Sequence, residues 1–333
     1  EESLKAWEDG AFLLARYGIT PSTPSSGTFD KELGLAYYER FYKRILELGA
    51  PHLEIAPESW PVIVKNGWED IAYYYYGSEW PGHENPKNAD IIRMKLKKAP
   101  GVKVSVAGVK PNECLKGLVK VWVLLTREYG QSSLIYPNDE VWWYVCCSPG
   151  PPYANLQLDA GQIDPRVLGW QLFQYGCTGF YYWRASMIRN NMQGERPEEK
   201  WPNRPWNTAT SDVPASHNDG QLIYPGPGGK AWSCIRLENM RDGADDYDYL
   251  CVLRDYVDQL KRLKGKRAGD AISKLIQRAE DALRITPELS VAVDNYTKDP
   301  AVVERERRRV CGLIEEVKAA LSAIFNKALL KSQ

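Results

Sequence analysis

The sequence contains few histidines and has no excess of charge of either sign. Its 333 residues hold three His, and 43 Lys and Arg balance 43 Asp and Glu. Balanced charge gives no electrostatic reason to expect a nucleic acid or an anionic membrane as a partner. No apolar run approaches the roughly 20 residues that a membrane-spanning helix needs, so we expect no membrane span.

Several common types of site are also missing. The seven Cys form no CxxC pair, and Cys146 and Cys147 lie side by side in an apolar strand. We therefore expect buried free thiols, not zinc ligands, a disulfide framework or a cysteine nucleophile. The histidines at 52, 83 and 217 are too scattered for a metal site, and no Ser-His-Asp arrangement stands out. We expect neither a metal nor a cofactor.

The first residues, "EESLKAWEDG", lack the basic and apolar regions of a signal peptide. A chain from which a leader had been removed would look the same. The opening residues therefore leave the localisation open.

What the chain does contain is tyrosine and tryptophan. It holds 20 Tyr and 12 Trp against 6 Phe. Both side chains combine a flat apolar face with a polar tip, which suits stacking on sugar rings while hydrogen-bonding hydroxyl groups. The composition favours carbohydrate binding, and ordinary core and surface aromatics are the alternative.

Short apolar strands alternate with amphipathic helices through the first half of the chain. We predict strands at "ITPS", "HLEIA", "IAYYYYG", "VKVSVAG", "VKVWVLL", "VWWYVCC" and "GFYYW", with "QLIYP" as a further candidate. Nearly continuous apolar runs are typical of parallel strands buried on both faces. The count predicts an α/β fold, a (β/α)8 TIM-like barrel that is complete or lacks its first strand. A doubly wound open sheet is the alternative, although its Gly-rich phosphate loop is absent.

Helices are predicted at 4–18, 29–49, 88–99 and 164–176, with Asp30 as the N-cap of the second and Gly49 as its C-terminal stop. Three more follow at 233–263, near 269–285 and at 301–330. We interpret the last two as packing helices with solvated outer faces. The expected domains are a catalytic barrel over 1–265 and extra C-terminal helices over 266–333 packed on it.

A barrel builds its active site at the carboxyl ends of its strands. The strand "AYYYYG" is followed there by Ser78, Glu79 and Trp80, and the polar stretch 185–220 predicts a binding loop. The candidate substrate-binding residues are Tyr144, Tyr153, Asn155, Asp159, Trp183, Trp201 and Trp206. A carboxylic acid among aromatic faces suits glycoside hydrolysis, in which an acid protonates the leaving oxygen. The alternative for Glu79 is a surface or salt-bridged carboxylate.

Five segments resemble glycoside hydrolase family 123, which includes β-N-acetylgalactosaminidases. They are "GWEDIAYYYYGSEW", "EVWWYVCCSPGPPYANLQLD", "DPRVLGWQLFQYGCTGFYYW", "GQLIYPG" and "SCIRLENMRDGADDYDYL", in the family's order from about 67 to 250. The resemblance implies a (β/α)8 catalytic barrel, a glycan substrate and a secreted or periplasmic location. The family's barrel is typically preceded by a β-sandwich domain, which we expect to be absent from this chain.

The resemblance also implies a retaining, substrate-assisted mechanism. In the family, the 2-acetamido group of the substrate attacks the anomeric carbon, an Asp orients that group, and the adjacent Glu is the general acid/base. On this sequence the Glu position falls on Glu79 and the Asp position on Ser78.

A serine hydroxyl can hydrogen-bond an amide but supplies no negative charge to a cationic intermediate. Three interpretations follow. The protein hydrolyses a sugar without a 2-acetamido group, using another carboxylate such as Glu58, Glu54 or Asp159; it has been altered at residue 78; or it is a carbohydrate-binding relative with weak or no turnover.

Overall fold

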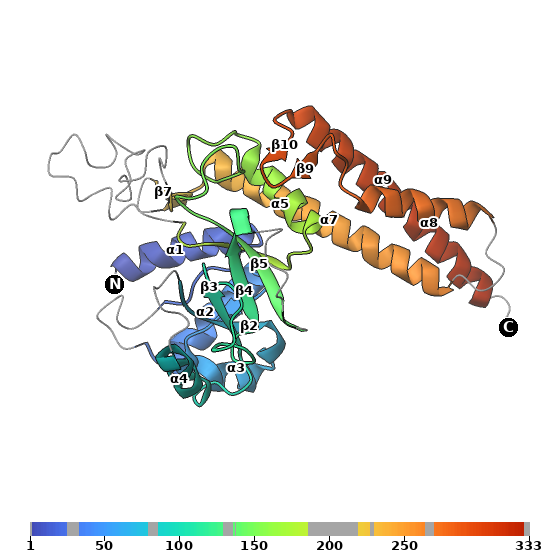
Figure 1. Ribbon diagram of the computed structural model, residues 1–333. Helices are drawn as coiled ribbons and strands as arrows, with labels where there is room; N and C mark the ends of the chain where they lie inside the picture. The colour runs from blue at the N-terminus through green and yellow to red at the C-terminus, as the bar shows by residue number, and fades with distance from the viewer. Residues whose placement is uncertain are drawn as a thin grey trace.

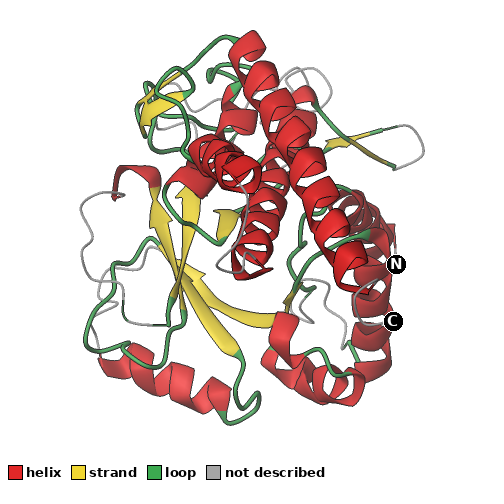
Figure 2. Cartoon of the chain, turned by 90° about the vertical axis from the view of Figure 1, so that its right-hand side faces the viewer, coloured by secondary structure: helices red, strands yellow, loops and turns green. Residues whose placement is uncertain are grey.

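The computed structural model describes residues 2–24, 33–78, 86–128, 136, 138–185, 219–226, 230–263 and 270–329. Its centre is a parallel six-stranded sheet in which strands adjacent in sequence are neighbours in space. The strands are β1 (Leu53–Glu54), β2 (Ala72–Ser78), β3 (Lys103–Ala107), β4 (Val121–Leu125), β5 (Glu140–Val145) and β6 (Gly179–Tyr182). The sheet curls into half of a barrel flanked by helices (Figure 1, Figure 2). The α/β prediction is confirmed, whereas the described residues do not form a full (β/α)8 barrel.

The first difference from the prediction lies in "ITPS", which is not a strand. The segment runs beside β1, where the side chains of Thr20 and Thr23 donate to the backbone carbonyls of His52 and Glu54. Proline has no backbone N–H to donate to a ladder, and a proline follows each of these threonines in the sequence. The segment therefore borders the sheet without extending it.

The second difference concerns "QLIYP", which does not join the parallel sheet. Its last two residues form β7 (Tyr224–Pro225), which pairs antiparallel with β8 (Ala231–Trp232) in a separate two-stranded sheet. The residues just before β7 return to the end of β6, because Leu222 and Ile223 both donate their backbone N–H to the carbonyl of Ala185.

Helices cover the convex face of the sheet. They are α1 (Glu2–Arg16), α2 (Leu35–Leu48), α3 (Trp60–Asn66), α4 (Pro86–Leu96) and α5 (Asp164–Gln174), with short 3-10 turns at Pro57–Ser59, Glu69–Ile71 and Thr126–Glu128. The predicted helices are confirmed. Gly49 ends α2 in a left-handed conformation, as expected, but Gly34 occupies the N-cap position, so the assignment of Asp30 as the N-cap was wrong.

Each central strand is apolar on both faces because both faces are covered. In β4, Trp122 and Leu124 pack outward in one core cluster with Ile92 of α4. Val121 and Val123 point the other way, into a cluster on the concave face. This explains why the strand runs read as continuous apolar stretches in the sequence.

The C-terminal part is a group of long helices. It contains α7 (Ile235–Leu263), α8 (Asp270–Leu283) and α9 (Pro300–Leu329), with a small antiparallel pair, β9 (Ser290–Ala292) and β10 (Asn295–Tyr296), between the last two. One apolar cluster joins α7, α8 and α9 to Val167 and Trp170 of α5. The domain boundary at residue 265 remains a prediction.

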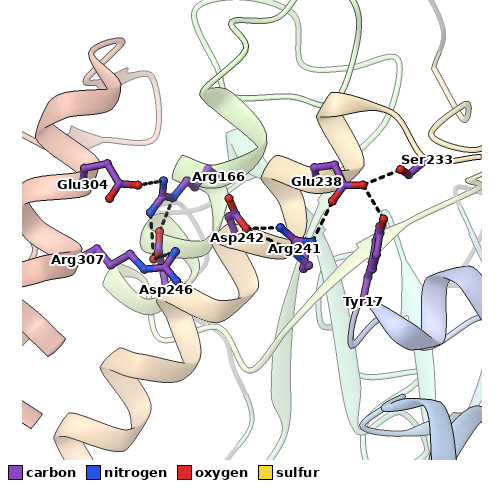
Figure 3. A network of polar contacts seen from close by, with 9 residues as sticks. All are labelled: Tyr17, Arg166, Ser233, Glu238, Arg241, Asp242, Asp246, Glu304 and Arg307. Carbon is purple, nitrogen blue, oxygen red and sulfur yellow. Dashed lines mark hydrogen bonds and ion pairs between the residues drawn. The ribbon is translucent and has the colours of Figure 1, made fainter.

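Helix α7 carries two polar networks that connect it to distant parts of the chain (Figure 3). Near its start, Glu238 accepts hydrogen bonds from Tyr17, which directly follows α1, and from Ser233. About two helical turns farther along, Asp246 pairs with Arg166 of α5 and Arg307 of α9. Among the described residues, no helix combines the length and the apolar composition that a bilayer crossing requires.

Candidate active site

The concave face of the half-barrel is lined with aromatic side chains. Tyr75 and Tyr144 both contact Tyr181, with ring centroids 5.0 and 5.8 Å from it. Tyr73 meets Trp142 edge to face at 5.0 Å. Trp183 packs on the same cluster from the end of β6. The structure thus places Tyr144 and Trp183 in one cluster, with Tyr144 buried, and a contact of either residue with a substrate stays a prediction.

Strand β2 leads to the proposed acid. Its pairing with β3 shifts register between Tyr75 and Gly77, so that Ser78 pairs with Ala107, a residue of the concave cluster. A bulge of this kind re-aims the chain at a strand end. Glu79 and Trp80 lie outside the described residues, as do Trp201 and Trp206, so their roles stay predictions.

The loop after β5 is held by the side chain of Asn155. This side chain is buried and donates to the carbonyl oxygens of Cys146 at 3.0 Å and Pro149 at 2.9 Å. Gln157 donates to the same Cys146 carbonyl at 2.7 Å. In the same loop, Tyr153 is half-buried and Asp159 is exposed. Substrate contacts by these loop residues stay predictions, and the bonds of Asn155 show that it fixes the path of the loop.

Asp219 is a site residue that the sequence analysis missed. It is 1 % exposed and accepts hydrogen bonds from the Tyr182 hydroxyl at 2.9 Å and from the Trp183 indole nitrogen at 3.0 Å. Burial raises the pKa of its carboxyl group, and these hydrogen bonds oppose the shift. Asp219 lies one residue before the segment "GQLIYPG", and that position was the only signal in the sequence.

Arg236, in the first turn of α7, is a second missed residue. It is 5 % exposed and donates to the carbonyls of Leu156 and Gln221 and to the Tyr224 hydroxyl. One guanidinium group therefore connects the loop after β5 to the segment that carries Asp219. A planar fork of donors suits such a role, because several acceptors are bound in fixed directions.

The carboxylates named as alternative partners of Glu79 differ in their surroundings. Glu54 of β1 lies beside Tyr73 of β2 in the register, accepts a hydrogen bond from its hydroxyl, and has a pKa that burial raises to about 7. Glu58 and Asp159 are exposed. Of the three, Glu54 alone has the protected setting that keeps a carboxylic acid protonated near neutral pH.

A parallel half-barrel with an aromatic concave face belongs to the α/β class that builds its sites at strand ends. Residues 62–253, more than half of the chain, match the family model of the glycoside hydrolase 123 catalytic domain. The chain therefore belongs to glycoside hydrolase family 123, and the resemblance seen in the sequence is confirmed.

A search of curated proteins gave no match. Among solved structures, the chain is similar to a family 123 glycoside hydrolase from Clostridium perfringens, described in a study of glycolipid glycan hydrolysis. The two share 12% identity with a TM-score of 0.47, over 91% of this chain and 57% of the other. The chain thus corresponds to little more than half the length of that relative.

Proposed function

We propose that this chain is a glycoside hydrolase that acts on β-linked N-acetylhexosamine or a related glycan, with Glu79 as the general acid/base. The observation that carries the proposal is the family match over 62–253, a range that includes Ser78, Glu79 and most of the aromatic concave face. Aromatic faces beside a carboxylic acid are also what a pyranose-binding site needs.

In the proposed reaction, Glu79 protonates the glycosidic oxygen while the 2-acetamido carbonyl oxygen of the substrate attacks C1. The bond from C1 to the leaving oxygen breaks, and a cationic oxazolinium forms. The Glu79 carboxylate then takes a proton from a water molecule that attacks C1 from the opposite face, and the bond from C1 to the acetamido oxygen breaks, which restores the 2-acetamido group. Two inversions at C1 give net retention of configuration.

Ser78 makes this chain differ from the family pattern in the charge beside Glu79. A neutral hydroxyl stabilises a developing cation less than a carboxylate does, because a charge-assisted hydrogen bond is roughly twice as strong as a neutral one. This difference favours two further candidates: a glycosidase for a sugar without a 2-acetamido group, and a carbohydrate-binding relative with weak or no turnover. In the first of these, Glu54 is the second carboxylate that we favour over Glu58 and Asp159, because it is the one of the three that is not exposed.

A panel of aryl β-glycosides, with and without 2-acetamido groups, tests the proposal. We expect the wild-type protein to release the aryl group. We expect Glu79→Gln to lose this activity on substrates with poor leaving groups, because the acid is gone. Sugar binding without release of any aryl group would instead favour the carbohydrate-binding candidate.

Ser78→Asp tests the substrate-assisted mechanism. Restoring the charge should raise kcat on an aryl 2-acetamido glycoside by roughly tenfold or more. This factor corresponds to about 1.4 kcal/mol of stabilisation of the transition state. Ser78→Asn is the matched control, since it offers a similar shape without the charge and should give no such gain. A folded Ser78→Asp protein with unchanged or lower activity would rule out the substrate-assisted route and direct attention to Glu54.

A further inference from the structure

The carboxylate of Asp219 joins three segments at the carboxyl edge of the sheet. Tyr182 and Trp183 donate to it from the end of β6 at 2.9 and 3.0 Å. The backbone N–H of Cys147 also donates to it from the loop after β5. A buried carboxylate is costly to desolvate unless its lone pairs are occupied by such donors.

Trp183 is restrained from two sides. Asp219 holds its indole N–H, and the Arg184 guanidinium lies 5.5 Å from its ring centroid. The ring also packs against the concave aromatic cluster but stays partly exposed, and Arg184 itself is exposed. A hydrogen bond to a fixed acceptor adds to this packing in selecting one rotamer of the indole.

Asp219 is itself held in place. The carbonyl of Gln221, two residues later, accepts a hydrogen bond from Arg236 at 2.6 Å, and the backbone N–H of Gly220 donates to the Tyr182 hydroxyl at 2.7 Å. The segment is therefore tied to β6 and to α7 by the two residues that directly follow the carboxylate. Because the acceptor cannot swing away, it can impose its direction on the indole.

We propose that Asp219 is a positioning residue of the sugar site, whose carboxylate fixes the indole of Trp183 as the stacking surface for a pyranose ring. The inference rests on the proposed function in that it assigns a sugar to this site. A sugar ring stacks only on an aromatic face of defined orientation, so loss of the Asp219 contact weakens binding without removing any group that touches the sugar.

The first measurement needs no turnover. The indole N–H signal of Trp183 is recorded by NMR in ¹⁵N-labelled protein and assigned by its absence in Trp183→Phe. Asp219→Asn should displace or broaden it, since the amide offers one neutral acceptor where the carboxylate offered two charged oxygens. Tyr182→Phe is the matched control: it removes the other side-chain donor and should cost similar thermal stability, but it should leave the Trp183 signal in place.

The second measurement adds N-acetylgalactosamine, or the aryl glycoside that the wild-type protein cleaves fastest. The sugar should move the Trp183 signal in the wild type, and Asp219→Asn should raise Kd or KM by roughly tenfold, a factor that corresponds to 1.4 kcal/mol. The pH profile of kcat, set by the acid/base, should be unchanged.

The two proposals fail in different ways. If the wild type cleaves no glycoside but the sugar still moves the Trp183 signal in an Asp219-dependent manner, the hydrolase proposal fails and the positioning role stands. If Asp219→Asn leaves the indole signal unchanged, or the sugar does not move that signal, Asp219 has a purely structural role. If Tyr182→Phe raises Kd as much as Asp219→Asn does, general loosening of the site explains both, and the positioning role is overturned.

Discussion

The backbones of Gly169 in α5 and Gly243 in α7 touch where the two helices cross. A methyl group on Gly169 would lie 1.9 Å from the carbonyl oxygen of Gly243, and one on Gly243 would lie 2.7 Å from the carbonyl oxygen of Arg166. These are backbone atoms, which cannot move aside as a flexible side chain can. The crossing therefore requires glycine on both helices and sets how closely the C-terminal helices approach the half-barrel.

Gly169→Ala should destabilise the protein by about 3 kcal/mol or more, because the two helices must separate to admit the methyl group. Chemical denaturation measures the loss. Gly312→Ala in α9 is the matched control, since a methyl group there meets no heavy atom within 4 Å. It should stabilise the protein by roughly 0.5–1 kcal/mol, the helix-propensity difference between the two residues. Equal effects of the two substitutions would contradict the close crossing.

Asp246 is the centre of the network between α5, α7 and α9 (Figure 3). Its carboxylate accepts from the Arg166 Nε at 2.8 Å and the Trp170 indole at 2.9 Å. Asp246→Asn should cost about 3–5 kcal/mol, the usual loss when one member of a buried ion pair is removed. The exposed pair Arg278–Glu316 is the control, and Arg278→Ala should change stability by at most about 1 kcal/mol. A small loss for Asp246→Asn would mean that Glu304 of α9, which also accepts from Arg166, compensates the guanidinium.

Much of the fold follows from the sequence because the strands of the half-barrel are buried on both faces. The runs around Trp122 and Trp143 could belong only to such strands or to buried helices, and their lengths favour strands. Closure of the barrel could not be predicted in this way. The segment at Thr20–Thr23 has the composition of a strand edge, but the prolines remove the donors that pairing needs.

The aromatic part of the candidate site follows from the same strand pattern. Trp183 and Tyr144 directly follow or end apolar strands, so their place at one edge is set by the sheet. Asp219 reaches the same edge on a segment without a periodic pattern, so the sequence does not indicate where its side chain lies. Arg236 and Asp246 also lie among many exposed charges on α7, and nothing in the spacing shows that these two are buried.

Arg236→Lys should separate the loop after β5 from the segment that carries Asp219. A lysine ammonium cannot reach the carbonyls of Leu156 and Gln221 and the Tyr224 hydroxyl together in the directions that the guanidinium serves. We expect a stability loss of about 1–3 kcal/mol from unsatisfied buried acceptors, together with weaker sugar binding. Arg241→Lys, on the same helix but half exposed, is the control and should have little effect. Full retention of sugar affinity in Arg236→Lys would show that the two loops hold their positions independently.

Glu54 should make the stability of the protein depend on pH. Burial raises the pKa of its carboxyl group from 4.5 to about 7, so the folded state binds a proton that the unfolded chain has released over this range. Its contribution is therefore fully present below pH 4.5 and is lost as the pH rises through about 7, by on the order of 3 kcal/mol. Glu54→Gln keeps the hydrogen-bonding shape without a titrating proton and should remove this loss.

Urea denaturation at pH 4.5 and pH 8 measures the difference, with Glu58→Gln as the control for removing one exposed carboxylate from the same region. The wild type and Glu58→Gln should both lose stability between the two pH values, and Glu54→Gln should lose about 3 kcal/mol less than either.

The Glu54→Gln variant also tests the chemistry of the site. If Ser78→Asp fails to raise activity and Glu54→Gln abolishes it at pH 6 while the protein stays folded, then Glu54 is the second carboxylate. Unchanged activity in Glu54→Gln would show that Glu54 has only a structural role, as the hydrogen-bond acceptor of the Tyr73 hydroxyl.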